Sequence, residues 1–149
     1  MKKIKYTPED ILSHNAIASI IKNDEGEILM QEHTKYGFWT IPLGKVKEGQ
    51  SIEDGLKQEV FEECNLIIKE CIKLKSKKYI YKRNNNKVNV HLHLFEIVKY
   101  TGKLNNNEPD KHKEQIFLSL KEIKKLQYLS DSTVFYLKYL GFARKPHLK

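Results

Sequence analysis

Residues 51–65 carry the signals that most constrain the fold, because this segment has helix boundaries and an apolar stripe of its own. Ser51 is a favoured N-cap residue, and Asp54 three positions later is suited to a capping box. Asn65 tolerates the left-handed conformation that commonly ends a helix. Apolar side chains recur between these limits at every fourth position, at Ile52, Leu56 and Val60. The segment is therefore predicted to be a helix that packs one side against a core.

Three glutamates, Glu59, Glu62 and Glu63, lie on this helix at a spacing that places their carboxylates on one side, at the border of the apolar stripe. Like charges at this spacing cost only about a few tenths of a kcal/mol each, so a solvated acidic face is one interpretation. A divalent cation is the other, because grouped carboxylates suit Mg²⁺ or Mn²⁺ and a bound cation relieves their repulsion. The spacing alone leaves both open.

The rest of the chain has the composition of strands and short helices around this segment. Strand-like stretches occupy 15–21, 27–31, 37–42, 67–83, 87–100 and 116–120, and further helices are expected at 121–126 and 131–140. Turn-forming residues predict a hairpin between the first two strands and another around Asn84, Asn85 and Asn86. The polar stretch 101–114 is predicted to be an exposed loop.

These elements predict an α+β fold with helices packed on a sheet, in a single domain spanning residues 1–149. No apolar run approaches the roughly 20 residues of a membrane span, and the N-terminus lacks the apolar stretch of a signal peptide. We therefore expect a cytoplasmic protein without a membrane partner. Two cysteines, Cys64 and Cys71, with no second pair to form a zinc site, agree with a reducing compartment.

The formal net charge is +8, which attracts polyanions in general. Nucleotides, RNA and DNA all satisfy this charge equally, and so does a lysine-rich surface with no specific partner. The charge therefore excludes none of these classes.

Residues 44–66, GKVKEGQSIEDGLKQEVFEECNL, resemble the Nudix box, whose pattern is G, five residues, E, seven residues, then R-E-U-x-E-E-x-G-U with U apolar. The preceding stretch 39–44, WTIPLG, resembles the lead-in W-x-U-P-G-G of the same family. The resemblance implies a Nudix fold, which is an α/β/α sandwich with a central mixed β-sheet flanked by helices. It also implies a pyrophosphohydrolase that acts on acid anhydrides and uses Mg²⁺, or Mn²⁺, to cut a nucleoside diphosphate linked to a group X.

The resemblance also assigns roles within the box. Glu62 and Glu63 match the principal metal ligands, and Glu59 matches a third ligand or the base that activates water. A backbone carbonyl at Leu43 or Gly44 would complete the coordination. The cation would neutralise the diphosphate and lower the pKa of the attacking water.

Four positions depart from the pattern: Leu43 and Asn65 replace glycines, Gln50 replaces the first glutamate, and Gln58 replaces the arginine. In the family the glutamate and the arginine form an ion pair that aligns the loop with the helix. Two amides can hydrogen-bond to each other instead, so we interpret Gln50 and Gln58 as a compensated exchange. The alternative is a Nudix-fold module that binds or senses a nucleotide with weakened catalysis.

Residues 105–117, NNNEPDKHKEQIF, are similar to a segment in which Nudix enzymes carry a further carboxylate. Glu114 is the first choice for this catalytic carboxylate and, beside Glu59, a candidate for the base, and Glu108 is the second choice. Phe117 is a candidate to stack on a base, and Lys45 and Lys47 are candidates to contact phosphate. A solvated charged loop, a core phenylalanine and solvated lysines are the alternatives.

Several other side chains are assigned to packing. We expect Trp39 and Cys64 to lie in the core, while Phe38 is left open between core and substrate. His91 and His93 share one strand face and are expected to have structural or substrate contacts and not to bind the cation.

The sequence leaves group X open among nucleoside triphosphates, ADP-ribose, dinucleoside polyphosphates and nucleotide sugars. An RNA-directed, decapping-like role is a further alternative that rests on the net charge and on the lysines and tyrosines of 75–83. The sequence leaves the oligomeric state open, and the resemblance makes a homodimer one candidate.

Overall fold

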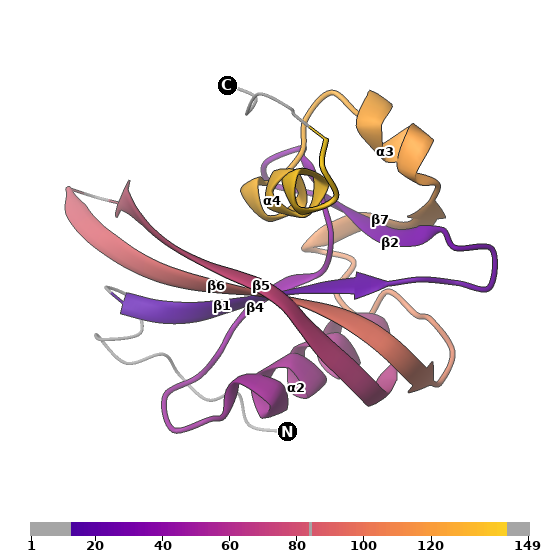
Figure 1. Cartoon of the computed structure of the whole chain (residues 1–149), viewed down its shortest axis with the longest axis horizontal. Coiled ribbons are helices and arrows are strands. Elements are labelled where there is room, and N and C mark those ends of the chain that lie inside the picture. The colour runs from indigo at the N-terminus through magenta and orange to yellow at the C-terminus, as the bar shows by residue number, and fades with distance from the viewer. Residues whose placement is uncertain (1–12, 84, 143–149) are drawn as a thin grey trace.

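The computed structural model describes residues 13–83 and 85–142, whose strands fall into two sheets (Figure 1). The first sheet has the order β4-β1-β6-β5, formed by Leu43–Lys45, Ser13–Ile21, Asn86–Thr101 and Ile67–Arg83. The second has the order β3-β2-β7, formed by Trp39–Thr40, Ile28–His33 and His112–Leu118. The helices are α2 (Ile52–Cys64), α3 (Leu120–Lys125) and α4 (Asp131–Tyr139).

Parallel pairing between β1 and β6 makes the first sheet mixed, because β1 pairs antiparallel with β4 and β6 pairs antiparallel with β5. Side chains on β1 alternate between the two faces of the sheet. Ala16, Ala18 and Ile20 belong to one buried cluster, whereas Ile17 and Ile21 belong to the other. The sheet therefore has a hydrophobic core on each face.

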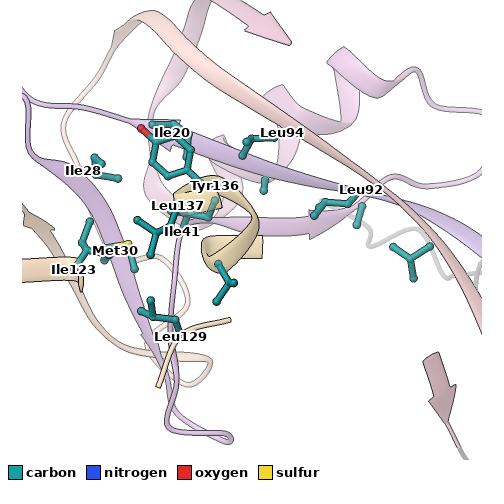
Figure 2. Close-up of a cluster of buried hydrophobic side chains, with 14 of the residues drawn as sticks. Ile20, Ile28, Met30, Ile41, Leu92, Leu94, Ile123, Leu129, Tyr136 and Leu137 are labelled. Carbon is teal, nitrogen blue, oxygen red and sulfur yellow. The ribbon is translucent and has the colours of Figure 1, made fainter. Parts of the chain in front are cut away.

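Helices cover both of these faces (Figure 1). On one face, Leu56 and Val60 of α2 pack with Ile17 and Phe95. On the other, residues of α4 and α3 pack with β1, β2 and β6, and Figure 2 shows this cluster around Ile20, Met30, Leu94, Ile123 and Leu137. This arrangement confirms the expected α/β/α sandwich.

The limits of α2 are those predicted. The Ser51 hydroxyl accepts a 3.1 Å hydrogen bond from the backbone N–H of Asp54, and Asn65 closes the helix in the left-handed conformation with φ of 63°. A Cβ on Gly55 would lie 3.0 Å from Val46 Cγ2, so this glycine allows the helix to pack closely on the preceding loop.

The pairing of the first two strands differs from the expected hairpin. A turn and a bridge between Lys22 and Ile28 join β1 to β2, but the two strands then enter different sheets. Partners far along the chain decide this, because β6 and β4 flank β1 whereas β7 and β3 flank β2.

Two boundaries also differ. The predicted loop 101–114 is shorter, since β6 extends to Thr101 and β7 already begins at His112. Ser130 caps α4, one residue before the expected Asp131, and its side chain accepts a hydrogen bond from the Thr133 backbone.

Within the described residues, no helix has the length and apolar character needed to cross a membrane.

Candidate active site

The three glutamates of α2 lie together on the side that faces the β4 loop, with different degrees of burial. Glu63 is 1% exposed, while Glu59 and Glu62 are half-buried. This confirms the expected position at the border of the helix's buried face. Because the residues sit at i, i+3 and i+4, one helix supplies all three carboxylates.

Glu59 is fixed between Gly44 and Lys47. A Cβ added to Gly44 would lie 2.6 Å from Glu59 Cγ and 2.7 Å from its Oε2, so only glycine leaves room for this carboxylate. Lys47 Nζ lies 3.5 Å from Glu59 Oε1 and is itself buried. Burial raises the pKa of Glu59, Lys47 lowers it and the Glu62 charge raises it, so the net shift is upward.

Gln50 and Gln58 form the amide pair that the sequence predicts. Gln50 Nε2 donates to Gln58 Oε1, and Gln58 Nε2 donates a 2.8 Å hydrogen bond to Glu62 Oε1. Gln50 Oε1 accepts from the backbone N–H of Lys47 at 3.2 Å. The amides therefore link the loop before α2 to one of its carboxylates, the connection that an ion pair would otherwise provide.

The Glu63 carboxylate has an amide and an imidazole at its closest contacts. Its Oε1 lies 3.4 Å from Gln31 Nε2 and 3.4 Å from His112 Nε2. Burial raises the pKa of Glu63 to about 8; Lys111 opposes this shift, and Glu59 and Glu108 add to it. Burial is also the main cause that lowers the pKa of His112 to about 4, and Lys111 contributes.

The Asn-rich loop between β6 and β7 binds the carboxyl end of α2. Backbone N–H groups of Asn105 and Asn107 donate to the carbonyls of Cys64 and Glu63, at 3.0 and 3.2 Å. Helix ends leave such carbonyls without intrahelical partners, so this contact satisfies them. The loop thereby holds Glu108 next to Glu63.

A β-bulge in β7 brings His112 to the same place. Glu32 pairs with Glu114 and His33 pairs with His112, so Lys113 is the extra residue. The bulge allows His112 and Gln115 to face α2 together: Gln115 Nε2 donates to the Glu63 carbonyl at 3.0 Å. Glu114 is exposed and, by alternation from Gln115, lies on the other face of the strand.

These side chains form a donor set that fits a divalent cation. One ligand atom from each of Glu63, Glu108 and His112 lies within 4.8 Å of the others, and the Glu59 carboxylate interacts with both Glu63 and Glu62. Carboxylate oxygens suit Mg²⁺ and Mn²⁺. Burial is the main cause of the raised pKa of Glu63, and the negative charges of Glu59 and Glu108 outline the site where a cation would be favoured.

A pocket of about 780 Å³ opens beside Glu59 and Gly44. The rings of His33, Tyr36 and Phe38 line one part of it, with centroids 4.8 Å apart for His33 and Tyr36 and 5.7 Å apart for Tyr36 and Phe38. Its other walls include Lys45, Lys111, Tyr79, Tyr81 and Asp131. The lining therefore combines aromatic rings with the Glu59 carboxylate and two lysines, groups suited to a ligand that has an apolar and an anionic part.

A larger recess of about 960 Å³ lies between Lys47, Gln50 and the β5–β6 hairpin. The glutamates of α2 do not line it. We take the smaller pocket as the candidate active site, because it contains Glu59 and the larger recess contains none of the candidate catalytic carboxylates.

The remaining predicted residues have mixed positions. Lys45 lines the pocket, whereas the ammonium group of Lys47 contacts Glu59. Phe117 packs against the core under α2, so its assignment to substrate remains a prediction without a pocket contact. Glu114 is outside the donor set, and the second choice, Glu108, occupies the position expected of a loop carboxylate.

Trp39 packs against the core and Cys64 is buried, as expected. Phe38, which the sequence left open, lines the pocket. His91 and His93 are neighbours on β6, with ring centroids 4.1 Å apart, and neither belongs to the donor set.

Sequence reasoning did not select His112, Lys111, Gln31 or Tyr36. The first two lie in the same Asn-rich segment as Glu108, so that motif was the available signal. Gln31 is a single polar residue in an apolar strand, and Tyr36 lies in a short polar turn, so neither has a sequence pattern that indicates a site.

Comparison with known proteins agrees with the fold and identifies the family. The family model described as NUDIX domain matches residues 12–138. The chain is 32% identical over 94 residues to an 8-oxo-dGTP diphosphatase from Buchnera aphidicola subsp. Schizaphis graminum, an alignment covering 62% of this chain and 68% of that protein.

Solved structures show the same fold. A MutT NUDIX hydrolase from Burkholderia pseudomallei superposes with a TM-score of 0.75 at 21% identity, covering 86% of this chain and 98% of the other. The E. coli ORF135 protein superposes with a TM-score of 0.71 at 21% identity, covering 88% and 90%.

Proposed function

The chain belongs to the NUDIX family, and from this premise we propose that it hydrolyses a purine nucleoside triphosphate with a divalent cation held by the glutamates of α2. Family membership makes the chain a Nudix pyrophosphohydrolase acting on the diphosphate of a nucleotide. The proposal adds the cation, the residues and the substrate class.

The observation that carries the proposal is the position of Glu59 in the wall of an aromatic-lined pocket, with Glu62 and Glu63 one turn further along the same side of α2. Gly44 leaves room for Glu59 at this position, and the amides of Gln50 and Gln58 connect the loop to Glu62. The exchanged pair therefore retains the contacts that align loop and helix.

Glu62 and Glu63 would hold Mg²⁺ or Mn²⁺, which supplies positive charge for the phosphates and lowers the pKa of water. Glu59 is our choice for the base, because it lines the pocket and burial raises its pKa, which makes it a better proton acceptor near neutral pH. The water oxygen bonds to phosphorus as the P–O–P bond breaks, releasing a nucleoside monophosphate and pyrophosphate. Lys111 and Lys45, both on the pocket wall, would contact phosphate oxygens.

The purine assignment rests on two observations. The relative that is 32% identical to this chain is an 8-oxo-dGTP diphosphatase. The stacked rings of His33 and Tyr36 offer a flat aromatic surface in the pocket wall, and base stacking on such a surface contributes about 1–3 kcal/mol.

An assay of released pyrophosphate and nucleoside monophosphate tests this function. The panel contains dGTP, 8-oxo-dGTP, dATP, dCTP, ADP-ribose and a nucleotide sugar, each with Mg²⁺, Mn²⁺ or EDTA. We expect the purine triphosphates to be cleaved fastest and EDTA to abolish turnover. Glu62→Gln and Glu63→Gln should each lower kcat by roughly 100-fold or more, the scale of losing a group that stabilises transition-state charge.

Glu25→Gln is the matched control, since Glu25 is an exposed glutamate in the β1–β2 turn. Unchanged rates in both Glu62→Gln and Glu63→Gln would refute the site. Preferential cleavage of ADP-ribose or a nucleotide sugar would refute the substrate class.

A second substrate class is the triphosphate end of RNA. Strand β5 exposes Lys73, Lys75, Lys77 and Lys78, and Tyr79 and Tyr81 of the same strand line the pocket. Steep salt dependence of cleavage for a 5′-triphosphorylated RNA, with faster turnover than for the free nucleotide, would favour this class.

A further inference from the structure

One imidazole lies among the carboxylates of the site. His112 is 2% exposed, and its Nε2 lies 3.4 Å from Glu63 Oε1. Its Nδ1 is buried without a hydrogen-bond partner. Glu108 completes a group whose three ligand atoms are within 4.8 Å of one another.

The spacing is compatible with a shared metal ion. Bonds from Mn²⁺- or Zn²⁺-sized ions to nitrogen or oxygen are about 2.0–2.2 Å, so two adjacent ligand atoms on one ion lie roughly 3 to 3.5 Å apart. The 3.4 Å between His112 Nε2 and Glu63 Oε1 falls in this interval.

The backbone holds His112 and Glu108 in place independently of any ion. The His112 N–H donates to the Glu108 carbonyl at 2.9 Å, and Asn106 Nδ2 donates to the His112 carbonyl at 2.7 Å. Asn106 Oδ1 also accepts from the Glu108 N–H at 3.3 Å. One asparagine thus fixes both residues that face Glu63.

Gln31 occupies the remaining contact. Its Nε2 lies 3.4 Å from both Glu63 Oε1 and His112 Nε2, a distance at the long limit for a hydrogen bond. Its Oε1 accepts a 2.7 Å hydrogen bond from Gln115. The short contact orients the Gln31 amide, and the two long contacts leave Glu63 and His112 weakly satisfied.

We propose that His112 Nε2 is a ligand of the divalent cation at this site, together with Glu63 and Glu108. This rests on the proposed function for Glu63 as a ligand. A mixed nitrogen and oxygen donor set favours Mn²⁺, Co²⁺ or Zn²⁺ over Mg²⁺, because imidazole suits the transition metals and Mg²⁺ takes oxygen ligands. The chain is thereby selective for a transition-metal ion.

The test is direct detection of the bond. Full-length protein is loaded with one equivalent of Mn²⁺ at pH 7.5 without nucleotide and examined by pulsed electron paramagnetic resonance. A ¹⁴N coupling that changes when histidine alone is labelled with ¹⁵N supports the proposal, and this measurement requires no variant. Bound Mn²⁺ without histidine coupling overturns it.

Affinity measurements by calorimetry give a second readout. Loss of an outer partner of a metal ligand already costs about 10–100-fold in affinity, so His112→Gln should weaken Mn²⁺ binding by at least about tenfold and Mg²⁺ binding by less. His93→Gln is the matched control, because His93 is also buried with an unpartnered Nδ1 but contacts Asn15. Equal losses for both cations in His112→Gln overturn the proposal.

Failure of this inference is distinguishable from failure of the proposed function. Hydrolysis in Mg²⁺ with no histidine coupling to bound Mn²⁺ removes His112 as a ligand and leaves the proposed function intact. If the native chain neither binds Mn²⁺ nor hydrolyses nucleotides, the inference about His112 and the proposed function are both wrong.

Discussion

A carboxyl group as buried as that of Glu63 links the stability of the fold to pH. Its pKa is about 8 in the folded chain and ordinarily 4.5, so the folded state holds a proton that the unfolded state releases. This contribution to stability is present below the unfolded value and is lost as the pH rises through about 8. His112 acts in the opposite sense, since its pKa is lowered to about 4, and its contribution is lost only as the pH falls below about 6.5.

We therefore expect the thermal midpoint measured in EDTA to fall between about pH 7.5 and 8.5, because Glu63 loses its proton there and the histidines, ordinarily at 6.5, have already lost theirs. Glu63→Gln should have a flatter dependence, because its amide does not titrate. Equal slopes for the two proteins would show that Glu63 is not protonated at neutral pH. Added Mn²⁺ should stabilise the native chain more at pH 8.5 than at 6.5, since metal binding requires the carboxylate.

Gly44 offers a second test at the scale of one residue. Gly44→Ala places a methyl group within 2.6 Å of Glu59 Cγ, and the flexible Glu59 side chain has to move. We expect kcat to fall by roughly 10–100-fold, the scale of misplacing a catalytic group by about 1 Å, with little change in thermal midpoint.

A double-mutant cycle shows whether this loss acts through Glu59. In a Glu59→Gln background, Gly44→Ala should cost little further activity. Fully additive losses would mean that Gly44 acts by another route.

At the scale of elements, α2 depends on what flanks it. The preceding loop is joined to it by the Gln50 and Gln58 amides, and the Asn-rich loop binds its last carbonyls. The catalytic helix is therefore held at both ends by polar contacts, and its middle is held by the apolar stripe.

The amide pair predicts a pattern of coupling. Gln50→Glu alone adds a negative charge beside Gln58 and close to Glu62, so it should lower the thermal midpoint. Adding Gln58→Arg should reverse that loss, because an arginine can pair with both carboxylates. Thermal unfolding of the two single variants and the double variant measures this coupling, and a double variant no more stable than Gln50→Glu would contradict it.

At the scale of the whole molecule, the pocket is assembled from parts of the chain that are distant in sequence. Aromatic rings come from the β2–β3 turn, the carboxylate from α2, and further walls from the β5–β6 hairpin and the start of α4. The residues expected to bind the base and those expected to act on the phosphates therefore lie on different elements. Substitutions in the two groups should change KM and kcat separately.

Tyr36→Ala is expected to raise KM by about tenfold or more while changing kcat little, because Tyr36 is 50% exposed, stacks on His33 and is neither a candidate metal ligand nor the candidate base. Steady-state kinetics with the fastest nucleotide of the panel measures both constants. Tyr139→Ala serves as the control, since Tyr139 is 42% exposed on α4 and does not line the pocket. A fall in kcat with unchanged KM would place Tyr36 in the chemical step instead.

The sequence by itself determined α2, its caps at Ser51 and Asn65, the common side of its glutamates and the amide pair. These features depend on contacts within a few turns of one helix and its adjoining loop, so spacing along the chain is enough to predict them. The family resemblance extended this local reading to the fold.

Only the tertiary structure decided which glutamate is buried, where β1 and β2 separate, and which residues join Glu63. His112 escaped prediction because the polar stretch 101–114 reads as an exposed loop, whereas His112 begins β7 and a bulge at Lys113 lets it face α2. Glu108 and Glu114 were likewise separated only by the path of the loop along the end of α2. Such choices depend on pairing between segments far apart in sequence, which local periodicity does not encode.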